Sequence, residues 1–358
     1  MPLARAMHGG GVRGSARGRE AFSRGHRAPE GIRAGCTLQH AVEGSNREVA
    51  PLLRSVNDRQ RHGIGSASSS IDDPQTKPSV PRSIAYTPMT AMAYVLEQFD
   101  LTGKGVAITG GGGYLGRPTA LGLAEAGATV VVCGRSEAPL AEVASEASTR
   151  GLRGRVIPFV ADISTDDGVG AVLDRVEQEA GSVYGWVNNA YSGAGGKLLE
   201  LTRAQVEASV AGGLTAALVA ADLAARRMVK AGSGGAIVNV ATMYGMVSPK
   251  PSVYREHPQF HNPPAYGAAK AGLIQFTRYA GCHLAPHGIR VNCVSPGPFP
   301  WGAPAAQTGF VDELCKQVPM GRVGRAHEIA GAVLFLLSPA SSYITGQNLA
   351  IDGGWTAW

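Results

Sequence analysis

The sequence of 358 residues is short of cysteine and of charge, and it holds no long apolar run. Its five cysteines are an odd number, and no two of them form a Cys-x-x-Cys pair, which argues against a disulfide framework and a zinc knuckle and favours a reducing compartment. No run of about 18 apolar residues occurs, so we expect no membrane-spanning helix. The 49 glycines follow no triplet period, which excludes collagen. An apolar fraction of 44% suits a globular protein.

The formal net charge of +6 is unevenly distributed along the chain. Residues 1–98 hold 13 Lys and Arg against 8 Asp and Glu, a net charge of +5, whereas residues 99–358 have a net charge of only +1. The globular part therefore shows no basic groove for DNA or RNA, and we expect no nucleic-acid partner.

Residues 1–98 alternate glycine, serine, arginine and proline without a helical or strand period, which predicts a disordered basic extension. Three interpretations are open. The segment is a flexible tail, or an Arg-rich targeting peptide, or it is absent from the native protein because translation starts at Met89 or Met92. We favour the last. A secretory signal is disfavoured, because the segment has no apolar core of the length such signals need.

From residue 99 on, apolar strands alternate with helical patterns. We expect strands at residues 105–109, 129–133, 156–161, 183–187, 236–240, 289–294 and 348–351, and helices at 115–126, 138–150, 166–180, in a long stretch to about 230, at 265–284 and at 326–337. Strands that are apolar throughout are buried on both faces. The fold class predicted for 99–358 is therefore α/β, a doubly wound parallel sheet in three α/β/α layers, with ligands bound at the carboxyl ends of the strands.

A glycine-rich turn follows the first expected strand directly. Gly110, Gly113 and Gly116 fit the spacing Gly-x-x-Gly-x-x-Gly, and the same stretch fits Thr-Gly-x-x-x-Gly-x-Gly except that Tyr114 replaces the middle glycine. Glycines let a backbone approach a pyrophosphate, and the following helix N-terminus presents N–H groups to it. Between a buried strand and a helix, this turn predicts a dinucleotide site.

The second and third strands carry the residues that bear on the choice of cofactor. No acidic residue follows the second strand to hold the 2′-hydroxyl of NAD; Arg135 stands there instead and suits a 2′-phosphate, so NADP is preferred over NAD. Asp162 ends the third strand, where it either faces the adenine or caps the next helix.

Tyr266 and Lys270 stand four residues apart in an expected helix, a spacing that puts them on one face. A tyrosine has a pKa near about 10, and a nearby ammonium would bring it closer to working pH. Thr242 ends the fifth strand and offers a hydroxyl to a substrate oxygen. Asn188 and Asn189 end the fourth strand, where they tie adjacent loops together or line the cleft; we favour the tying role.

With these residues in order, residues 99–358 resemble a short-chain dehydrogenase/reductase of the compact single-domain type, and in particular its sugar-related, gluconate 5-dehydrogenase-like members. The resemblance covers nearly all of that segment. It rests on the glycine turn, Asp162, Asn188-Asn189-Ala190, Thr242 at the catalytic serine position, Tyr266 with Lys270, Pro296-Gly297, and Ile344-Thr345-Gly346 leading into Asp352-Gly353-Gly354.

The resemblance implies a Rossmann-fold oxidoreductase that transfers a hydride between NAD(P) and a secondary alcohol or ketone. Tyr266 would be the general acid/base, Lys270 would lower its pKa and bind the nicotinamide ribose, and Thr242 would orient the substrate. The cofactor would lie along Gly110, Gly113, Tyr114, Leu115, Gly116, Arg135, Asp162, Ile163, Asn189, Ala190, Tyr266, Lys270, Pro296 and Gly297. The family needs no catalytic metal.

Four departures from the family pattern stand out. Thr242 replaces a serine, and Tyr114 and Tyr191 replace glycines, so two rings are expected to crowd the edge of the cofactor site. Gly213 aligns with the family's active-site asparagine, so a proton relay behind Lys270 would run through water or another group.

The fourth departure is a long gap between Thr242 and Tyr266, which is expected to overhang the pocket. Its Arg255, His257 and His261 are candidates to bind hydroxyls or a carboxylate, unless the loop simply packs on the surface. The pattern favours a polar, sugar-like or hydroxy-acid substrate.

Two other functions stay open: an extended-type nucleotide-sugar epimerase or dehydratase, and a non-catalytic protein that senses its cofactor. By resemblance we expect a cytoplasmic homodimer or homotetramer that acts on a small molecule, without a membrane partner.

Overall fold

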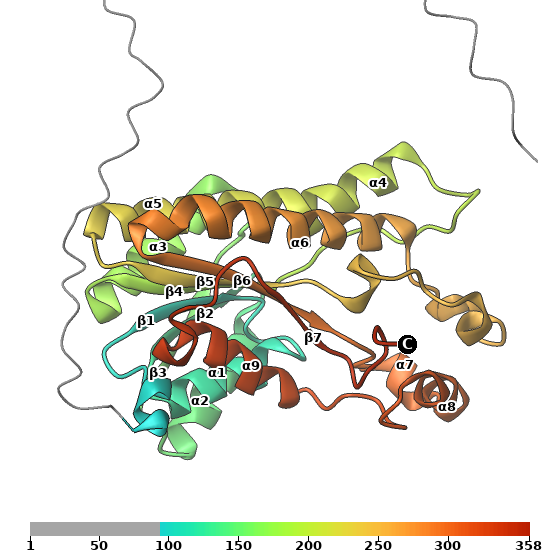
Figure 1. Cartoon of the computed structure of the whole chain (residues 1–358), viewed down its shortest axis with the longest axis horizontal. Helices are drawn as coiled ribbons and strands as arrows, with labels where there is room; N and C mark the ends of the chain where they lie inside the picture. Colours follow the sequence, from blue (N-terminus) through green and yellow to red (C-terminus); the bar gives the residue numbers. More distant parts are fainter. Residues whose placement is uncertain (1–93) are drawn as a thin grey trace, which may run out of the picture. The chain divides into compact units, whose positions relative to one another are not determined.

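The computed structural model describes residues 94–358 (Figure 1). The extension predicted for residues 1–98, with its start sites at Met89 and Met92, therefore lies almost wholly outside the described residues. The extension was predicted to end at residue 98, but its last residues already belong to a short 3-10 helix, η1 (Val95–Phe99). The ring of Phe99 lies 6.3 Å from that of Phe335, a contact far along the chain that the local sequence does not reveal.

Seven parallel strands form one sheet in the order β3-β2-β1-β4-β5-β6-β7. They are β1 (Gly105–Thr109), β2 (Thr129–Gly134), β3 (Arg155–Val160), β4 (Val183–Asn188), β5 (Gly235–Val240), β6 (Ile289–Pro296) and β7 (Asn348–Ile351). The chain starts at the centre, moves outward to β3 and then returns to β4 on the other side of β1. Such a reversal leaves a crevice at the carboxyl ends of β1 and β4, where open α/β sheets bind ligands.

Helices cover both faces of the sheet, which confirms the predicted three layers (Figure 1). One face carries α1 (Gly116–Glu125), α2 (Glu137–Thr149) and α9 (Glu328–Leu337). The other carries α3 (Asp166–Ala180), α5 (Ala216–Ala231) and α6 (Pro264–Leu284). Each face has its own apolar core because neighbouring side chains of a strand point to opposite sides: Val106 and Ile108 join the first core, and Ala107 between them joins the second.

The long helical stretch expected before β5 is interrupted. α4 (Arg203–Val210) continues into α5 through one π-helical turn at Ala211–Thr215, labelled η2. The stretch Arg203–Ala231 is long and apolar enough to pass a membrane-span test, but Ala220, Ala224 and Met228 on its inner side are buried in the second core. Core packing thus accounts for its apolar composition.

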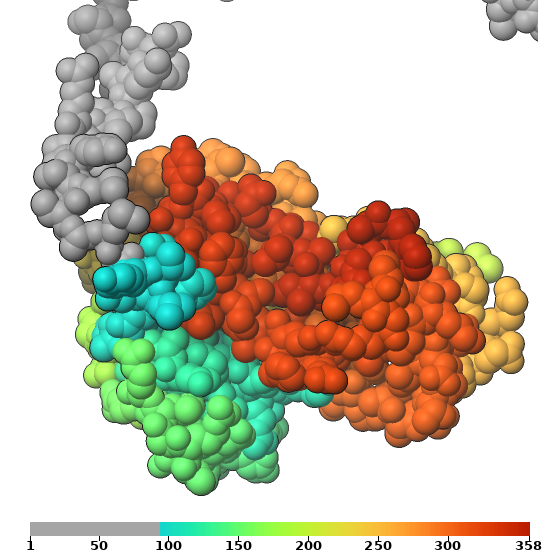
Figure 2. Space-filling model, turned by 60° about the horizontal axis from the view of Figure 1, so that its bottom comes forward, coloured from blue at the N-terminus to red at the C-terminus, as the bar shows by residue number. Residues whose placement is uncertain are grey.

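Two short helices, α7 (Ala303–Ala306) and α8 (Thr308–Gln317), were not expected. They follow the proline-rich stretch after β6, where local pattern predicts only a loop. Phe310 and Leu314 of α8 are nonetheless buried, in a separate small apolar cluster near the chain's C-terminus. Figure 2 shows this orange and red C-terminal part of the chain beside the cyan and green surface that comes from the first part of the described chain.

Candidate active site

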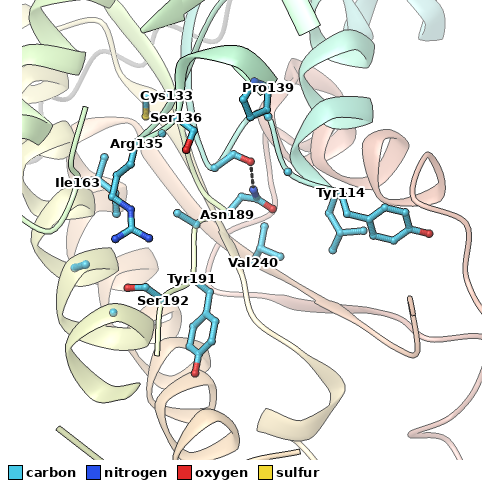
Figure 3. A pocket seen from close by; sticks show the side chains of 18 of the residues that line it. Tyr114, Cys133, Arg135, Ser136, Pro139, Ile163, Asn189, Tyr191, Ser192 and Val240 are labelled. Carbon is cyan, nitrogen blue, oxygen red and sulfur yellow. Dashed lines mark hydrogen bonds between the residues drawn. The ribbon is translucent and has the colours of Figure 1, made fainter. Parts of the chain in front are cut away.

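A cleft of about 670 Å³ runs along the carboxyl ends of the central strands (Figure 3). It is lined at one end by Arg135, Asp162 and Ile163 and at the other by Tyr266, Lys270 and Thr242. Of the cofactor residues expected from the sequence, Gly110, Gly113, Tyr114, Leu115, Asn189, Ala190, Pro296 and Gly297 also line it. Gly116 does not. The sequence missed Ser136, Pro139, Ser192, Val240, Phe299 and Trp301, which line the cleft but belong to no recognisable motif.

Gly116 acts through packing inside the glycine turn. A Cβ placed on Gly116 would lie 2.2 Å from the carbonyl oxygen of Gly110, so only glycine fits between the turn and α1. Gly110 itself has a φ of 63°, in the left-handed region that glycine adopts readily. The turn thus places the first turn of α1 beside the cleft, and no side chain of the described residues caps that helix. Arg117 already donates its N–H to the Gly113 carbonyl and Pro118 has none, so the backbone N–H groups of Leu115 and Gly116 are the ones that suit a bound phosphate.

Asn189, directly after β4, holds the glycine turn in place, as the tying interpretation predicted, and it also lines the cleft. The Asn189 side-chain amide donates to the carbonyl oxygens of Thr109, at 2.9 Å, and Gly110, at 3.0 Å. The Thr109 hydroxyl accepts from the backbone N–H groups of Asn189 and Ala190, both at 3.0 Å. Asn188 instead donates to Asn239 and to the Ala217 carbonyl, which ties β4 to β5 and α5.

Arg135 and Asp162 meet at the far end of the cleft. The exposed Arg135 side chain extends into it beside Ile163, whereas Tyr114 points away from Arg135 (Figure 3). Asp162 accepts a hydrogen bond from the backbone N–H of Ser164, which together with the nearby Arg135 lowers the pKa of Asp162. The alternative that Asp162 caps α3 is wrong. Thr165 is the cap, with its hydroxyl accepting from the N–H of Gly168 at 3.1 Å.

Tyr266 and Lys270 project from α6 to the other end of the cleft, where Thr242 leaves β5. Lys270 is buried, and its ammonium donates to the Val240 carbonyl at 2.7 Å. The pKa of Tyr266 is raised to about 12, not lowered as the spacing suggested, because burial of the phenol outweighs its interaction with the Thr242 hydroxyl. Burial also lowers the pKa of Lys270 to about 8, so its ammonium loses a proton at a lower pH than an exposed lysine does.

The buried ammonium of Lys270 costs stability, which leads to a first prediction. Below about pH 8 the folded chain must bury a charged lysine. Between about pH 8 and 10.5 the unfolded chain holds more protons than the folded one, so the free energy of unfolding rises with pH. Above that range Lys270 is neutral in both the folded and the unfolded chain, and the cost of burying its charge is gone. Lys270→Met removes the cost of about 3 kcal/mol but also the hydrogen bond to Val240, worth about 1–1.5 kcal/mol.

We therefore expect the ligand-free Lys270→Met variant to melt about 2–6 °C above the parent at pH 7. The difference should shrink as the pH rises and change sign by about pH 10.5, where only the lost hydrogen bond to Val240 remains. Thermal melts across that pH range measure it. Lys230→Met, on an exposed residue of α5, is the matched control and should show no such pH-dependent difference. A Lys270→Met variant that melts below the parent at pH 7 would contradict the prediction.

Tyr191 occupies the place that a longer side chain at position 213 would need. Its ring lies edge-on to Tyr266 with centroids 4.8 Å apart, and the Lys270 ammonium lies 5.7 Å from its centre. A Cβ on Gly213 would lie 3.0 Å from a ring carbon of Tyr191. The ring and the glycine are thus complementary, which explains why the two departures occur together. Tyr114 is different: it is 39% exposed and packs beside Trp301.

A second cavity of about 440 Å³ opens beside Tyr266 and Thr242. It lies between the insertion loop (residues 246–263) and the segment 297–314, and it is lined mainly by aromatic and proline side chains. The expectation that Arg255, His257 and His261 bind substrate there is wrong, since none of them lines the cavity. Arg255 is exposed, His257 packs against Phe260 and Phe310, and His261 contacts the carbonyls of Pro258 and Gly196.

Two sets of contacts hold the insertion loop in place, one near its start and one further along it. The Lys250 ammonium donates to the Gln317 side chain at 3.0 Å and lies over the ring of Trp355. Further along, the rings of Tyr254 and Phe260 pack against Phe310 of α8. The unexpected helix α8 is therefore what holds the loop over the cavity.

Comparisons with known proteins agree on one family. A family model described as enoyl-(acyl carrier protein) reductase, of the short-chain alcohol dehydrogenase type, matches residues 113–356. The chain is 33% identical over 260 residues to the 3-oxoacyl-(acyl-carrier-protein) reductase of Thermotoga maritima, covering 71% of this chain and 98% of the relative. It is 36% identical over 258 residues to the cis-4-hydroxycyclohexanecarboxylate dehydrogenase of Sinomonas cyclohexanicum, covering 70% and 95%.

Among solved structures, a gluconate 5-dehydrogenase from Burkholderia cenocepacia in complex with NADP and tartrate is 30% identical. It superposes with a TM-score of 0.65 over 74% of this chain and all of that one.

Proposed function

The chain belongs to the short-chain dehydrogenase/reductase family of NAD(P)-dependent oxidoreductases, and from that premise we propose that it interconverts a secondary alcohol and a ketone on a small hydroxylated substrate, with NADP(H) as its preferred cofactor. One observation carries the proposal. A single cleft joins the glycine turn and Arg135 at one end to Tyr266, Lys270 and Thr242 at the other.

The cleft fits a dinucleotide in shape and chemistry. The glycine turn and the uncapped N-terminus of α1 would hold the pyrophosphate, and Arg135 would pair with a 2′-phosphate. Lys270 and the backbone at Pro296-Gly297 would border the nicotinamide half. When bound, the nicotinamide supplies the redox chemistry, accepting or giving the hydride.

The protein's own side chains supply position and the proton. Because burial keeps the Tyr266 phenol protonated at neutral pH, Tyr266 donates its proton to a ketone oxygen during reduction and must lose that proton first during oxidation. The Thr242 hydroxyl oxygen accepts from the backbone N–H of Tyr244, and the hydroxyl also interacts with the Tyr266 phenol. A substrate oxygen placed between the two hydroxyls would receive the Thr242 hydrogen bond in place of Tyr266. Together the two hydroxyls orient the reacting oxygen.

The direct test measures the absorbance of reduced nicotinamide in purified protein given NADP or NAD and a panel of cyclic and open-chain alcohols. Turnover with stoichiometric release of reduced cofactor supports the proposal. It also excludes the epimerase alternative, because an epimerase recycles its cofactor. Tight cofactor binding without turnover on any alcohol or ketone would favour the cofactor-sensing alternative.

Arg135 carries the proposed preference for NADP, which gives a second prediction. Arg135→Ala is expected to raise the KM for NADP by about 10-fold or more, as loss of a charge-assisted pair would, and to leave the KM for NAD nearly unchanged. Because Arg135 is exposed at the end of β2, folding should be unaffected. The comparison of KM for the two cofactors measures the effect, with Arg153→Ala, on an exposed side chain outside the cleft, as control. Equal changes for NADP and NAD would remove Arg135 from this role.

We further propose that the enzyme is a homodimer or homotetramer in the cytoplasm. Tyr279, Tyr343 and Trp358 are strongly exposed aromatic residues that contact with another copy would cover. Cys133 and Cys293 are buried free thiols, which suits a reducing compartment. Light scattering tests the oligomer, and a monomer at working concentration would contradict it.

A further inference from the structure

We propose that the second cavity takes a neutral, ring-bearing secondary alcohol, and that Asn262 holds a second polar group of that substrate. The inference rests on the proposed function, since it names the substrate class for the same site. It comes from the walls of the cavity, from their lack of charge, and from one buried amide without a partner.

Aromatic rings form the main walls of this cavity. Tyr244 and Tyr254 contribute from the side of the insertion loop, and Phe299, Trp301 and Phe310 from the opposite side. Rings of this kind bury large apolar areas and favour contact with the faces of other rings. A flexible open chain would lose more conformational freedom on entering such a site than a ring whose shape is already set. The walls therefore favour a cyclic substrate.

No side chain that lines this cavity, in the described part of the chain, is charged. The histidines and arginine of the insertion loop contact other groups or solvent, and Lys270 lines only the cofactor cleft. A carboxylate brought into the cavity would lose its hydration without gaining an ion pair, which is strongly unfavourable. The phenols of Tyr244 and Tyr254 hydrogen-bond each other, and burial raises the pKa of both, so they stay neutral too. The substrate is therefore uncharged where it contacts these walls.

Asn262 is a residue of the cavity wall whose side-chain oxygen has no hydrogen-bond partner among the described residues. That oxygen, Oδ1, is buried. Nearly all buried polar atoms in proteins have a partner, so this unpaired oxygen indicates a donor that the described residues do not supply. Because the oxygen is buried rather than exposed to the cavity, the Asn262 amide must rotate to present it to a ligand hydroxyl. The reacting oxygen of the substrate is taken by Tyr266 and Thr242, so Asn262 is left for a second hydroxyl.

The backbone couples Asn262 firmly to the reacting end. Pro263 and Pro264 follow it, and Pro264 begins α6, which carries Tyr266. Proline fixes φ and is well suited to the first turn of a helix, so the amide and the phenol keep a set separation. The site therefore selects a ring with two polar substituents at a defined distance.

The test compares four probes on the intact protein with NADP: cyclohexane-1,4-diol, cyclohexanol, 4-hydroxycyclohexanecarboxylate and gluconate. We expect kcat/KM for the diol to exceed that for the ring carboxylate and for gluconate by about 10-fold or more, since the anions find no counter-charge. Asn262→Leu should lower kcat/KM for the diol by about 3- to 10-fold, the range of one hydrogen bond, and leave cyclohexanol nearly unchanged. Gln259→Ala, on an exposed residue of the same loop that does not line the cavity, is the control.

Each outcome bears on a separate part of the proposal. A preference for gluconate or the ring carboxylate overturns the substrate class while the oxidoreductase function stands. An Asn262→Leu variant that loses the diol and cyclohexanol equally overturns the role of Asn262; if this variant does not fold, Asn262→Ser carries the same comparison. A protein that binds cofactor but oxidises no alcohol overturns both this inference and the function beneath it.

Discussion

Replacement of Tyr266 by phenylalanine is expected to lower kcat by about 10²- to 10⁴-fold, the usual contribution of a positioned acid or base. The ring would keep its edge-on contact with Tyr191 and its place in the cleft, so only the proton-carrying oxygen is lost. Steady-state turnover in both directions measures the effect. Cofactor affinity, followed by nicotinamide fluorescence, should change little.

The pH profile separates this role from a general loss of structure. Since burial raises the pKa of Tyr266 to about 12, alcohol oxidation by the parent enzyme should increase with pH from neutral to alkaline conditions, as more phenolate forms. Ketone reduction should lack that increase, because the phenol is already protonated. The residual alcohol oxidation by Tyr266→Phe should no longer increase with pH, because the variant has no phenol to ionise. Turnover close to that of the parent would remove Tyr266 from the chemistry.

Replacement of Gly116 by valine should be the most damaging change at the cofactor end. Its Cβ would lie 2.2 Å from the Gly110 carbonyl oxygen and 2.9 Å from the Gly111 Cα, both backbone atoms that cannot rotate away. The glycine turn must shift, and with it the Asn189 hydrogen bonds that hold it. We expect cofactor affinity to fall by about 10- to 100-fold, with a lower Tm, since overpacking costs about 1–3 kcal/mol.

Gly170→Ala is the matched control for this change. Gly170 lies inside α3, and a Cβ there meets nothing within 4 Å. The substitution should leave cofactor binding unchanged and raise stability by about 0.5–1 kcal/mol, because alanine is the better helix former. Titration of each variant with NADP, alongside thermal melts, makes the comparison. Unimpaired binding by Gly116→Val would show that the turn does not shape the site.

The arrangement of strands and helices was largely predictable because buried parallel strands and amphipathic helices leave strong periodic patterns. β1, β5 and α3 were expected within a residue of where they lie. The two helices after β6 were missed, since α8 is stabilised by packing of Phe310 and Leu314 rather than by its local sequence. The π-helical turn at Ala211–Thr215 was missed for a similar reason: its Gly212 lies against the Ser192 backbone and its Gly213 against the Tyr191 ring, which are contacts between distant segments.

The sequence alone determined the sheet, the glycine turn and the group of residues at the strand ends, because each depends on short-range spacing: glycine where backbone must approach backbone, and tyrosine and lysine one helical turn apart. Only the tertiary structure decided what those groups experience. Burial raised the pKa of Tyr266 where spacing suggested the opposite. Packing and hydrogen bonds hold the loop histidines outside the cavity, Arg255 faces solvent, and Asn262 lies in the cavity wall. Desolvation and side-chain contacts depend on segments distant in the chain, so they arise only when the chain folds.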